Sequence, residues 1–203
     1  MPVKGANSRE AVLDAAESVF ADLGFDGATF SDICAAADVS RGLPSYLFGS
    51  KDQLYREVVD RAATHLRSAV TEPLRSGQSL SLEALTHRFI ETYIEYLSRN
   101  ERIVRLLQWE LLSDPRSSRP YAPSSALFAE MYEIIDEAAR RERSAVDVRA
   151  LLGSMVALCF FPFVMRDRVK AQTLYDGSKK SIASLKRHAS ELISAHLRGQ
   201  RHA

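Results

Sequence analysis

Residues 29–53 read TFSDICAAADVSRGLPSYLFGSKDQ, and this stretch decides the fold. It opens on Thr29, a hydroxyl that can cap a helix, and Asp32 follows three residues later, where its carboxylate can reach back to the cap. Ser50 and Gln53 repeat the same pattern at the end of the stretch. Between the two starts there is room only for two short helices joined by a tight turn, which is the helix-turn-helix arrangement. A short helix that exposes small and polar side chains can be laid in the major groove of DNA.

The rest of the chain repeats apolar residues at the 3.6 period of a helix and nowhere alternates over the length of a strand, so we expect an all-α protein. A first helix is expected from a cap at Asn7 or Ser8 to Gly24, and the helix that Ser50 starts is expected to reach about Val70. We expect a DNA-binding domain over residues 1–50 and a larger helical domain over 51–203. The later helices are expected at about 79–97, 100–113, 124–142, 145–161 and 175–198.

The charges give no simple argument for a nucleic-acid partner. The net charge is +1 over 203 residues, with 46% hydrophobic and 26% charged residues, which is ordinary for a soluble globular protein. Residues 1–60 hold five basic and ten acidic side chains. A DNA-binding surface must therefore depend on where the few cations sit.

Membrane and secretory segments are not expected. The nearly uncharged run from Ala150 to Met165 is shorter than the ~20 residues of a membrane span, and Gly153 and Pro162 interrupt it, so we interpret it as a buried helix. No signal peptide is recognisable, and Cys34 and Cys159 form no CxxC pair. These features favour a cytoplasmic protein.

Enzyme chemistry is not expected either. The sequence has no GxSxG, GxGxxG, P-loop or HExxH motif, and its five histidines show no metal-ligand spacing. We therefore expect no catalytic residue, no metal site and no cofactor.

The N-terminal third resembles the DNA-binding domain of the tetracycline-repressor (TetR) family of transcriptional regulators. The resemblance covers roughly residues 9–56 and rests on AAESVFADLGFDGATFSDICAAADVSRG (15–42), then Phe48, the GSK segment and Leu54. Asp38 stands where the family usually has a left-handed glycine, a conformation that aspartate tolerates. Leu43-Pro44-Ser45-Tyr46 replaces the family's usual Thr-Leu-Tyr and the aromatic or His after it. Pro44 predicts that the recognition helix either begins around it or is distorted there.

The resemblance implies a set of DNA contacts on these helices: Thr29, Ser31, Ser40, Arg41, Leu43, Pro44, Ser45, Tyr46 and Lys51. Several have a simpler alternative, since Thr29, Ser40 and Ser50 could be helix caps only. Lys51, at the start of a capped helix, suits a phosphate clamp. Tyr46 is expected to face DNA because Phe48 takes the core position. Lys4 and Arg9 form either an arm near the minor groove or a disordered end.

For residues 51–203 the resemblance implies an effector pocket and a dimer interface. The pocket residues would come from Phe89, Tyr93, Tyr96, Trp109, Glu110, Phe128, Tyr132 and Phe160, although each could equally be core. The last two helices would pair with those of a second copy. Together these features predict a repressor that binds a palindromic operator as a homodimer and is released by a small-molecule effector. The alternative is a helical protein-interaction scaffold with a degenerate DNA-binding domain.

Overall fold

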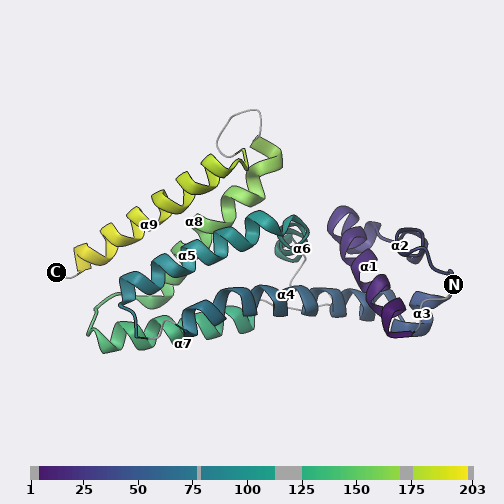
Figure 1. Ribbon diagram of the computed structural model, residues 1–203, viewed down its shortest axis with the longest axis horizontal. Coiled ribbons are helices and arrows are strands. Elements are labelled where there is room, and N and C mark those ends of the chain that lie inside the picture. The colour runs from purple at the N-terminus through teal and green to yellow at the C-terminus, as the bar shows by residue number, and fades with distance from the viewer. Residues whose placement is uncertain (1–4, 77–78, 113–124, 170–175, 201–203) are drawn as a thin grey trace. The chain divides into compact units, whose positions relative to one another are not determined.

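The computed structural model describes residues 5–76, 79–112, 125–169 and 176–200, and these residues form helices and no strand (Figure 1). The all-α prediction is confirmed. The helices are α1 (Gly5–Gly27), α2 (Phe30–Ala37), α3 (Leu43–Phe48), α4 (Lys51–Arg75), α5 (Leu82–Arg99), α6 (Glu101–Leu112), α7 (Ser125–Arg141), α8 (Val148–Val169) and α9 (Lys179–Gln200).

The chain packs into two compact units. One holds residues 1–64 together with 102–123, and the other holds residues 65–101 together with 124–203. The first half of α4 and nearly all of α6 therefore belong with the helix-turn-helix. The functional division expected at residue 50 stays a prediction, because packing alone does not assign a function to each part.

In the first unit, both predicted capping boxes are present. The Thr29 hydroxyl accepts from the Asp32 amide at 3.2 Å, and the Asp32 carboxylate accepts from the Thr29 amide at 2.9 Å. The Thr29 hydroxyl also donates to the Asp32 carboxylate at 2.6 Å, and this bond, followed by the one from the Thr29 amide, lowers the pKa of Asp32. Ser50 and Gln53 make the equivalent pair at the start of α4. Asp38 ends α2 with φ 51° and ψ 50°, so aspartate does take the left-handed position expected for it.

The ends of α1 differ from the expectation. The helix already begins at Gly5, ahead of the expected cap. Gly24, expected to end it, has φ 69° and ψ 176°, but one further turn reaches Gly27. The backbone bends at Gly24, and the amide of Ala28 then bonds back to the Gly24 carbonyl at 3.2 Å.

In the second unit, α5 is the central helix and contacts α7, α8 and α9 (Figure 1). Its buried side supplies five of the largest fully buried side chains of this core: Leu85, Phe89, Ile90, Ile94 and Leu97. Its N-terminus is capped twice. Ser81 accepts from the Ala84 amide at 3.2 Å, and the Glu142 carboxylate accepts from the Leu82 amide at 2.6 Å.

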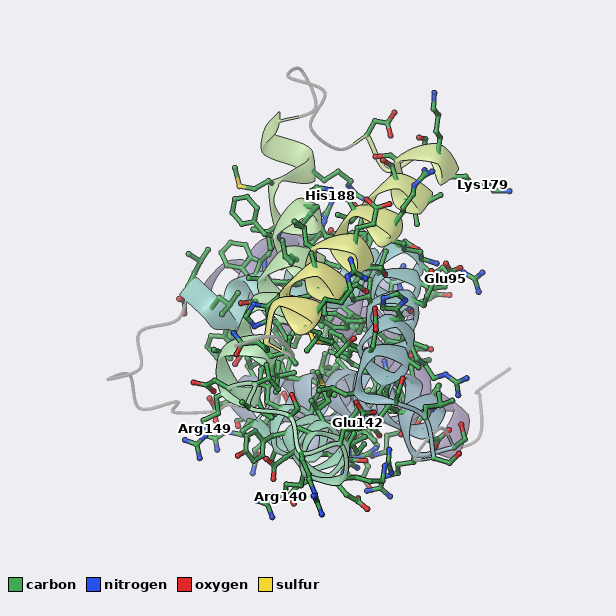
Figure 2. All side chains as sticks on the ribbon, turned by 90° about the vertical axis from the view of Figure 1, so that its left-hand side faces the viewer. Glu95, Arg140, Glu142, Arg149, Lys179 and His188 are labelled. Carbon is green, nitrogen blue, oxygen red and sulfur yellow. The ribbon has the colours of Figure 1, made fainter. Side chains whose placement is uncertain are left out.

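Figure 2 shows α9 running from Lys179 across this unit, and the packing places it on both α5 and α8. Lys186 of α9 bonds to Glu95 of α5 at 2.7 Å and pairs with Glu91 at 3.2 Å. His87 of α5 lies 2.6 Å from the hydroxyl of Ser194 of α9. Two polar contacts thus fix α9 along the length of α5.

The expectation of a buried helix over residues 150–165 needs correction. Helix α8 is longer than expected, and only 33% of the segment Val148–Arg166 is buried within this chain. By length and composition alone this segment could also cross a membrane, but the core helix of a soluble protein meets the same two criteria. Phe161 on α8 is 59% exposed and Leu192 on α9 is 44% exposed. The apolar pattern could not distinguish burial in the chain's own core from burial against a partner.

Helix α4 also runs further than expected, through Pro73 to Arg75. The Pro73 carbonyl accepts from the Ser76 hydroxyl at 2.9 Å and from the Arg88 guanidinium at 3.2 Å. Partners outside the ordinary helical pattern therefore stabilise the last turn of α4.

Candidate nucleic-acid interface

Helix α3 has an outer side formed by Tyr46 and an inner side formed by Phe48. Pro44 lies in its first turn, so the helix begins around the proline without distortion, which is the first of the two alternatives raised by the sequence. Phe48 is 7% exposed, whereas Tyr46 is 85% exposed. The expected division between a core aromatic and an outward aromatic is confirmed for this pair.

The other predicted DNA contacts fall into two groups. Thr29, Ser31, Ser40, Arg41 and Ser45 are exposed, as a binding surface requires. Leu43 and Lys51 are half-buried and Pro44 is buried. Pro44 therefore has little surface to offer a duplex, and in this structure it serves to start α3.

The turn that carries Ser40 and Arg41 is held from behind by Cys34. The Cys34 thiol lies 3.6 Å from the Ser40 carbonyl and 3.7 Å from the Arg41 carbonyl. The Arg41 guanidinium itself has no ion-pair or hydrogen-bond partner among the residues that the structure describes. An exposed guanidinium in this setting is free to bind a phosphate or the O6 and N7 atoms of a guanine.

Lys51 has a role that the sequence did not suggest. Its ammonium donates to the carbonyl of Phe25 at 2.8 Å and to the carbonyl of Ala28 at 2.9 Å. It also lies 4.4 Å from the centre of the Phe25 ring. The lysine thus joins the start of α4 to the segment between α1 and α2. Its phosphate contact stays a prediction, for which only the third ammonium hydrogen is left.

The remaining cations of α1 and the first half of α4 are paired inside the domain. Arg9 pairs with Glu57, and its guanidinium lies 4.8 Å from the centre of the Phe48 ring. Arg61 contacts Asp14 at 2.7 Å, Glu17 at 2.9 Å and Glu10 at 3.3 Å. Arg56 pairs with Asp52 at 3.0 Å. Arg9 is therefore part of the α1–α4 packing, and Lys4 lies outside the described residues.

Two of the predicted effector residues, Trp109 and Glu110, lie in the first unit, on α6. The Trp109 indole donates to the Ala21 carbonyl at 3.1 Å, and its ring packs against Gly24. The Tyr55 hydroxyl donates to the Glu110 carboxylate at 2.5 Å. Both side chains attach α6 to the helix-turn-helix, a role that helical spacing in the sequence does not reveal.

The other six predicted effector residues lie in the second unit. Phe89 and Tyr93 are buried and stack with ring centres 5.1 Å apart, and burial raises the pKa of the Tyr93 hydroxyl. Tyr132 is covered by the Arg149 guanidinium at 5.4 Å from its ring centre. Tyr96 and Phe160 are half-buried and Phe128 is exposed. Their assignment to an effector site stays a prediction.

A hollow of about 780 Å³ opens beside α7, but it involves none of these residues. Charged residues supply most of its lining, which is formed by Arg75, Ala126, Ala129, Glu130, Glu133, Ile134, Asp136, Glu137 and Arg140. Glu130 is already paired with Arg75 at 2.8 Å. Within the described ranges, no cluster of three or more His, Cys, Asp or Glu side chains could hold a metal ion.

Within the first unit, α1–α3 form a three-helix arrangement with a capped turn and a short, outward-facing helix, which defines a helix-turn-helix DNA-binding protein. Residues 12–58 match the family model described as bacterial regulatory proteins, tetR family. The match places the helix-turn-helix domain of this chain in that family.

Similar proteins match far beyond the first unit. The chain is 27% identical over 160 residues to the helix-turn-helix-type transcriptional repressor Rv1474c of Mycobacterium tuberculosis. The aligned residues make up 79% of each protein. A TetR-family transcriptional regulator from Mesorhizobium loti shares the fold with a TM-score of 0.72 at 17% identity, covering 97% of this chain and 98% of that one. The regulator FadR of Bacillus subtilis, solved in complex with stearoyl-CoA, gives a TM-score of 0.70 at 16% identity over 91% of this chain and 97% of that one. At these identities the two solved structures show a common fold.

Proposed function

We propose that this protein is a dimeric transcriptional repressor that binds a palindromic DNA operator through α3 and releases it when a small molecule binds the second unit. The observation that carries the proposal is the exposure of Tyr46 on a helix whose other aromatic, Phe48, is buried. A tyrosine that is 85% exposed adds little to the core of its own domain, so its place on the outer side of α3 favours a role in binding.

Different exposed side chains would contact different parts of the DNA. Arg41 reaches phosphate or a guanine edge, and Tyr46 supplies the second long contact. Thr29, Ser31, Ser40 and Ser45 are short hydroxyl side chains that suit the phosphate backbone or nearby base edges. The single proton of the Thr29 hydroxyl is already donated to the Asp32 carboxylate at 2.6 Å, so Thr29 can only accept a hydrogen bond, as from a base edge, through its remaining lone pair.

The dimer is proposed to form through α8 and α9. Both helices expose large apolar side chains, Phe161 on α8 and Leu192 on α9. Small residues on the same helices, such as Gly153 and Ala183, are exposed and allow close approach. A second copy related by a two-fold axis would cover these faces, and its symmetry is the reason to expect a palindromic operator.

The effector is proposed to bind in the second unit, among the aromatic side chains of α5, α7 and α8. A neighbour of the same fold, FadR of Bacillus subtilis, was solved with an acyl-CoA bound, which supports a ligand-binding role for a helical unit of this kind. The ligand would act by stabilising a conformer whose two α3 helices no longer fit the half-site spacing. The protein would work in the cytoplasm, where bacterial DNA lies.

Selection from a library of random duplexes by the purified protein tests the proposal. We expect a palindromic motif to be enriched, with two half-sites about one helical turn apart. A retained pool with the same sequence composition as the input would contradict the repressor and favour the interaction scaffold.

A further inference from the structure

We infer that the helix-turn-helix engages DNA with one cation per subunit, Arg41, while the other cations of residues 5–64 serve inside the domain. This inference rests on the proposed function and adds the chemistry of the contact. It follows from the positions of the five basic side chains in this range: Arg9, Arg41, Lys51, Arg56 and Arg61.

Lys51 is a positioning residue in this account. Two of its three ammonium hydrogens are used by the carbonyls of Phe25 and Ala28, and the ring of Phe25 covers it at 4.4 Å. These bonds fix the segment that leads into Thr29, the first of the predicted DNA-contact residues in the sequence. If the ammonium turned toward a phosphate, the carbonyls of Phe25 and Ala28 would lose their hydrogen-bond donor. The free-energy cost of these lost hydrogen bonds opposes such a movement.

Arg61 is held more firmly still, and Arg9 is held by two contacts at once. Arg61 is 18% exposed at its side chain and is surrounded by the carboxylates of Glu10, Asp14 and Glu17. Arg9 is engaged by Glu57 and by the face of Phe48 together. Arg61 cannot leave for DNA without stranding the mostly buried carboxylate of Glu17, whereas Arg9 would have to give up both Glu57 and the Phe48 ring.

Arg56 is the cation that could be freed most easily. Its pair with Asp52 is an exposed i,i+4 pair, and such pairs contribute only about 0.3–0.5 kcal/mol. Arg56 therefore needs its own variant in the test. Arg41, by contrast, is exposed and has no side-chain partner to give up within the described residues.

The surrounding charge makes additional ion pairs with phosphate less favourable. Residues 5–64 carry ten acidic side chains against the five basic ones. Acidic side chains repel the phosphate backbone and reduce electrostatic steering of the encounter. Recognition by hydroxyl groups, one guanidinium and one tyrosine avoids a dependence on a strongly basic surface.

A small number of ion pairs has a measurable consequence. The logarithm of the binding constant falls with the logarithm of salt concentration with a slope of about −0.9 for each neutralised phosphate. Two subunits with one cation each give a slope of about −2. Raising KCl from about 50 to 200 mM should then weaken operator binding by about tenfold, where six or more ion pairs would weaken it by about a thousandfold.

The test is a titration of a fluorescent operator duplex with the full-length protein at several KCl concentrations. Wild type, Arg41→Gln, Lys51→Met, Arg56→Gln and Arg102→Gln are compared. Arg102 is the matched control, since it is an exposed arginine of the same unit on α6, outside the helix-turn-helix. We expect only Arg41→Gln to flatten the slope, from about −2 to near zero.

Lys51→Met is expected to lower the melting temperature and to leave the slope at the wild-type value. A wild-type slope steeper than about −4 would overturn the inference whatever the variants do, so the test stands even if Lys51→Met fails to fold. A flattened slope in Lys51→Met or Arg56→Gln would also overturn it. Absence of any sequence-specific binding at low salt would instead contradict the proposed function itself.

Discussion

At the residue scale, Tyr46 and Phe48 allow an exposed and a buried aromatic side chain on the same short helix to be compared. Tyr46→Ala should weaken operator binding by about 1–3 kcal/mol and leave the melting temperature unchanged, because the side chain contacts little of its own domain. Arg41→Ala should behave in the same way. Operator titration and thermal unfolding of the same samples measure both effects.

Phe48→Ala is the matched control for this prediction. Phe48 is buried and its ring is covered by the Arg9 guanidinium, so its truncation should cost about 3–5 kcal/mol of folding free energy. A sharp fall in the melting temperature of Tyr46→Ala, with operator binding preserved, would show that Tyr46 is a packing residue and that the contact surface is misplaced.

Gly24 tests the attachment of α6 to α1. Its φ of 69° and ψ of 176° lie in a region that only glycine adopts readily, and a Cβ there would stand 3.1 Å from the Trp109 ring. Gly24→Ala should therefore lower the free energy of unfolding by about 1–3 kcal/mol in urea titrations. Gly42→Ala is the control, since Gly42 has φ −84° and open space around it, and a similar loss in that variant would remove the argument from backbone strain.

At the element scale, the junctions of the first unit could be read from the sequence with good accuracy. Thr29 with Asp32 and Ser50 with Gln53 depend on local spacing, and both pairs form as expected. Asp38 also takes the conformation that its place after α2 requires. Local hydrogen bonds of this kind are visible in a few adjacent letters of sequence.

Contacts between distant segments could not be read in the same way. The Lys51 ammonium donates to carbonyls more than twenty positions away, and the Trp109 indole donates to the Ala21 carbonyl on α1. The sequence shows a lysine at a helix start and a tryptophan in an apolar stripe, both of which have more common roles. Only the packing decides which role is taken.

The contact of α9 with α5 gives a prediction about pH. The hydrogen bond from Lys186 holds the pKa of Glu95 below its ordinary value of 4.5. Burial opposes the charge of Lys186, but the hydrogen bonds to Glu95 and Glu91 outweigh it and raise its pKa above 10.5. The stabilisation from Glu95 is therefore lost as the pH falls through its lowered pKa, and that from Lys186 is lost as the pH rises through its raised pKa.

Lys186→Met should accordingly reduce the free energy of unfolding by about 1 kcal/mol near pH 7, and the difference from wild type should shrink below pH 4.5 and above pH 10.5. Urea unfolding at fixed protein concentration and several pH values measures it. Lys179→Met, at the exposed start of α9, is the control and should match wild type (Figure 2). A difference for Lys186→Met that stays constant into strong acid would contradict this assignment of the ion pair.

At the scale of the whole molecule, the exposed apolar faces of α8 and α9 predict assembly. A stable interface between two copies should bury at least ~1,000 Å² in total. Leu192→Asp should place a charge in that interface and give monomers or insoluble protein, whereas Leu192→Ala should keep the dimer with a weaker association. Leu158→Asp on α8 should act like Leu192→Asp. A folded Leu192→Asp dimer in sedimentation would mean that a different surface pairs.

The whole-molecule features were also the hardest to predict from the sequence. The number and order of helices follow from periodicity, and most ends agree to within a few residues. The periodicity does not predict that α6 packs with the helix-turn-helix or that α8 is largely exposed. An apolar stripe shows that a helix face is buried but not which element covers it. The candidate effector residues illustrate the same point, since Trp109 and Glu110 turn out to hold α6 to α1 and α4.

The most direct test of the central claim is a comparison of two duplexes made from the selected operator. One keeps the natural half-site spacing, and the other has about five base pairs inserted between the half-sites, which turns them to opposite faces of the helix. If a symmetric dimer reads DNA with its two α3 helices, affinity for the second duplex should fall to the level of a random sequence at the same salt concentration. Equal affinity for both duplexes would contradict the account.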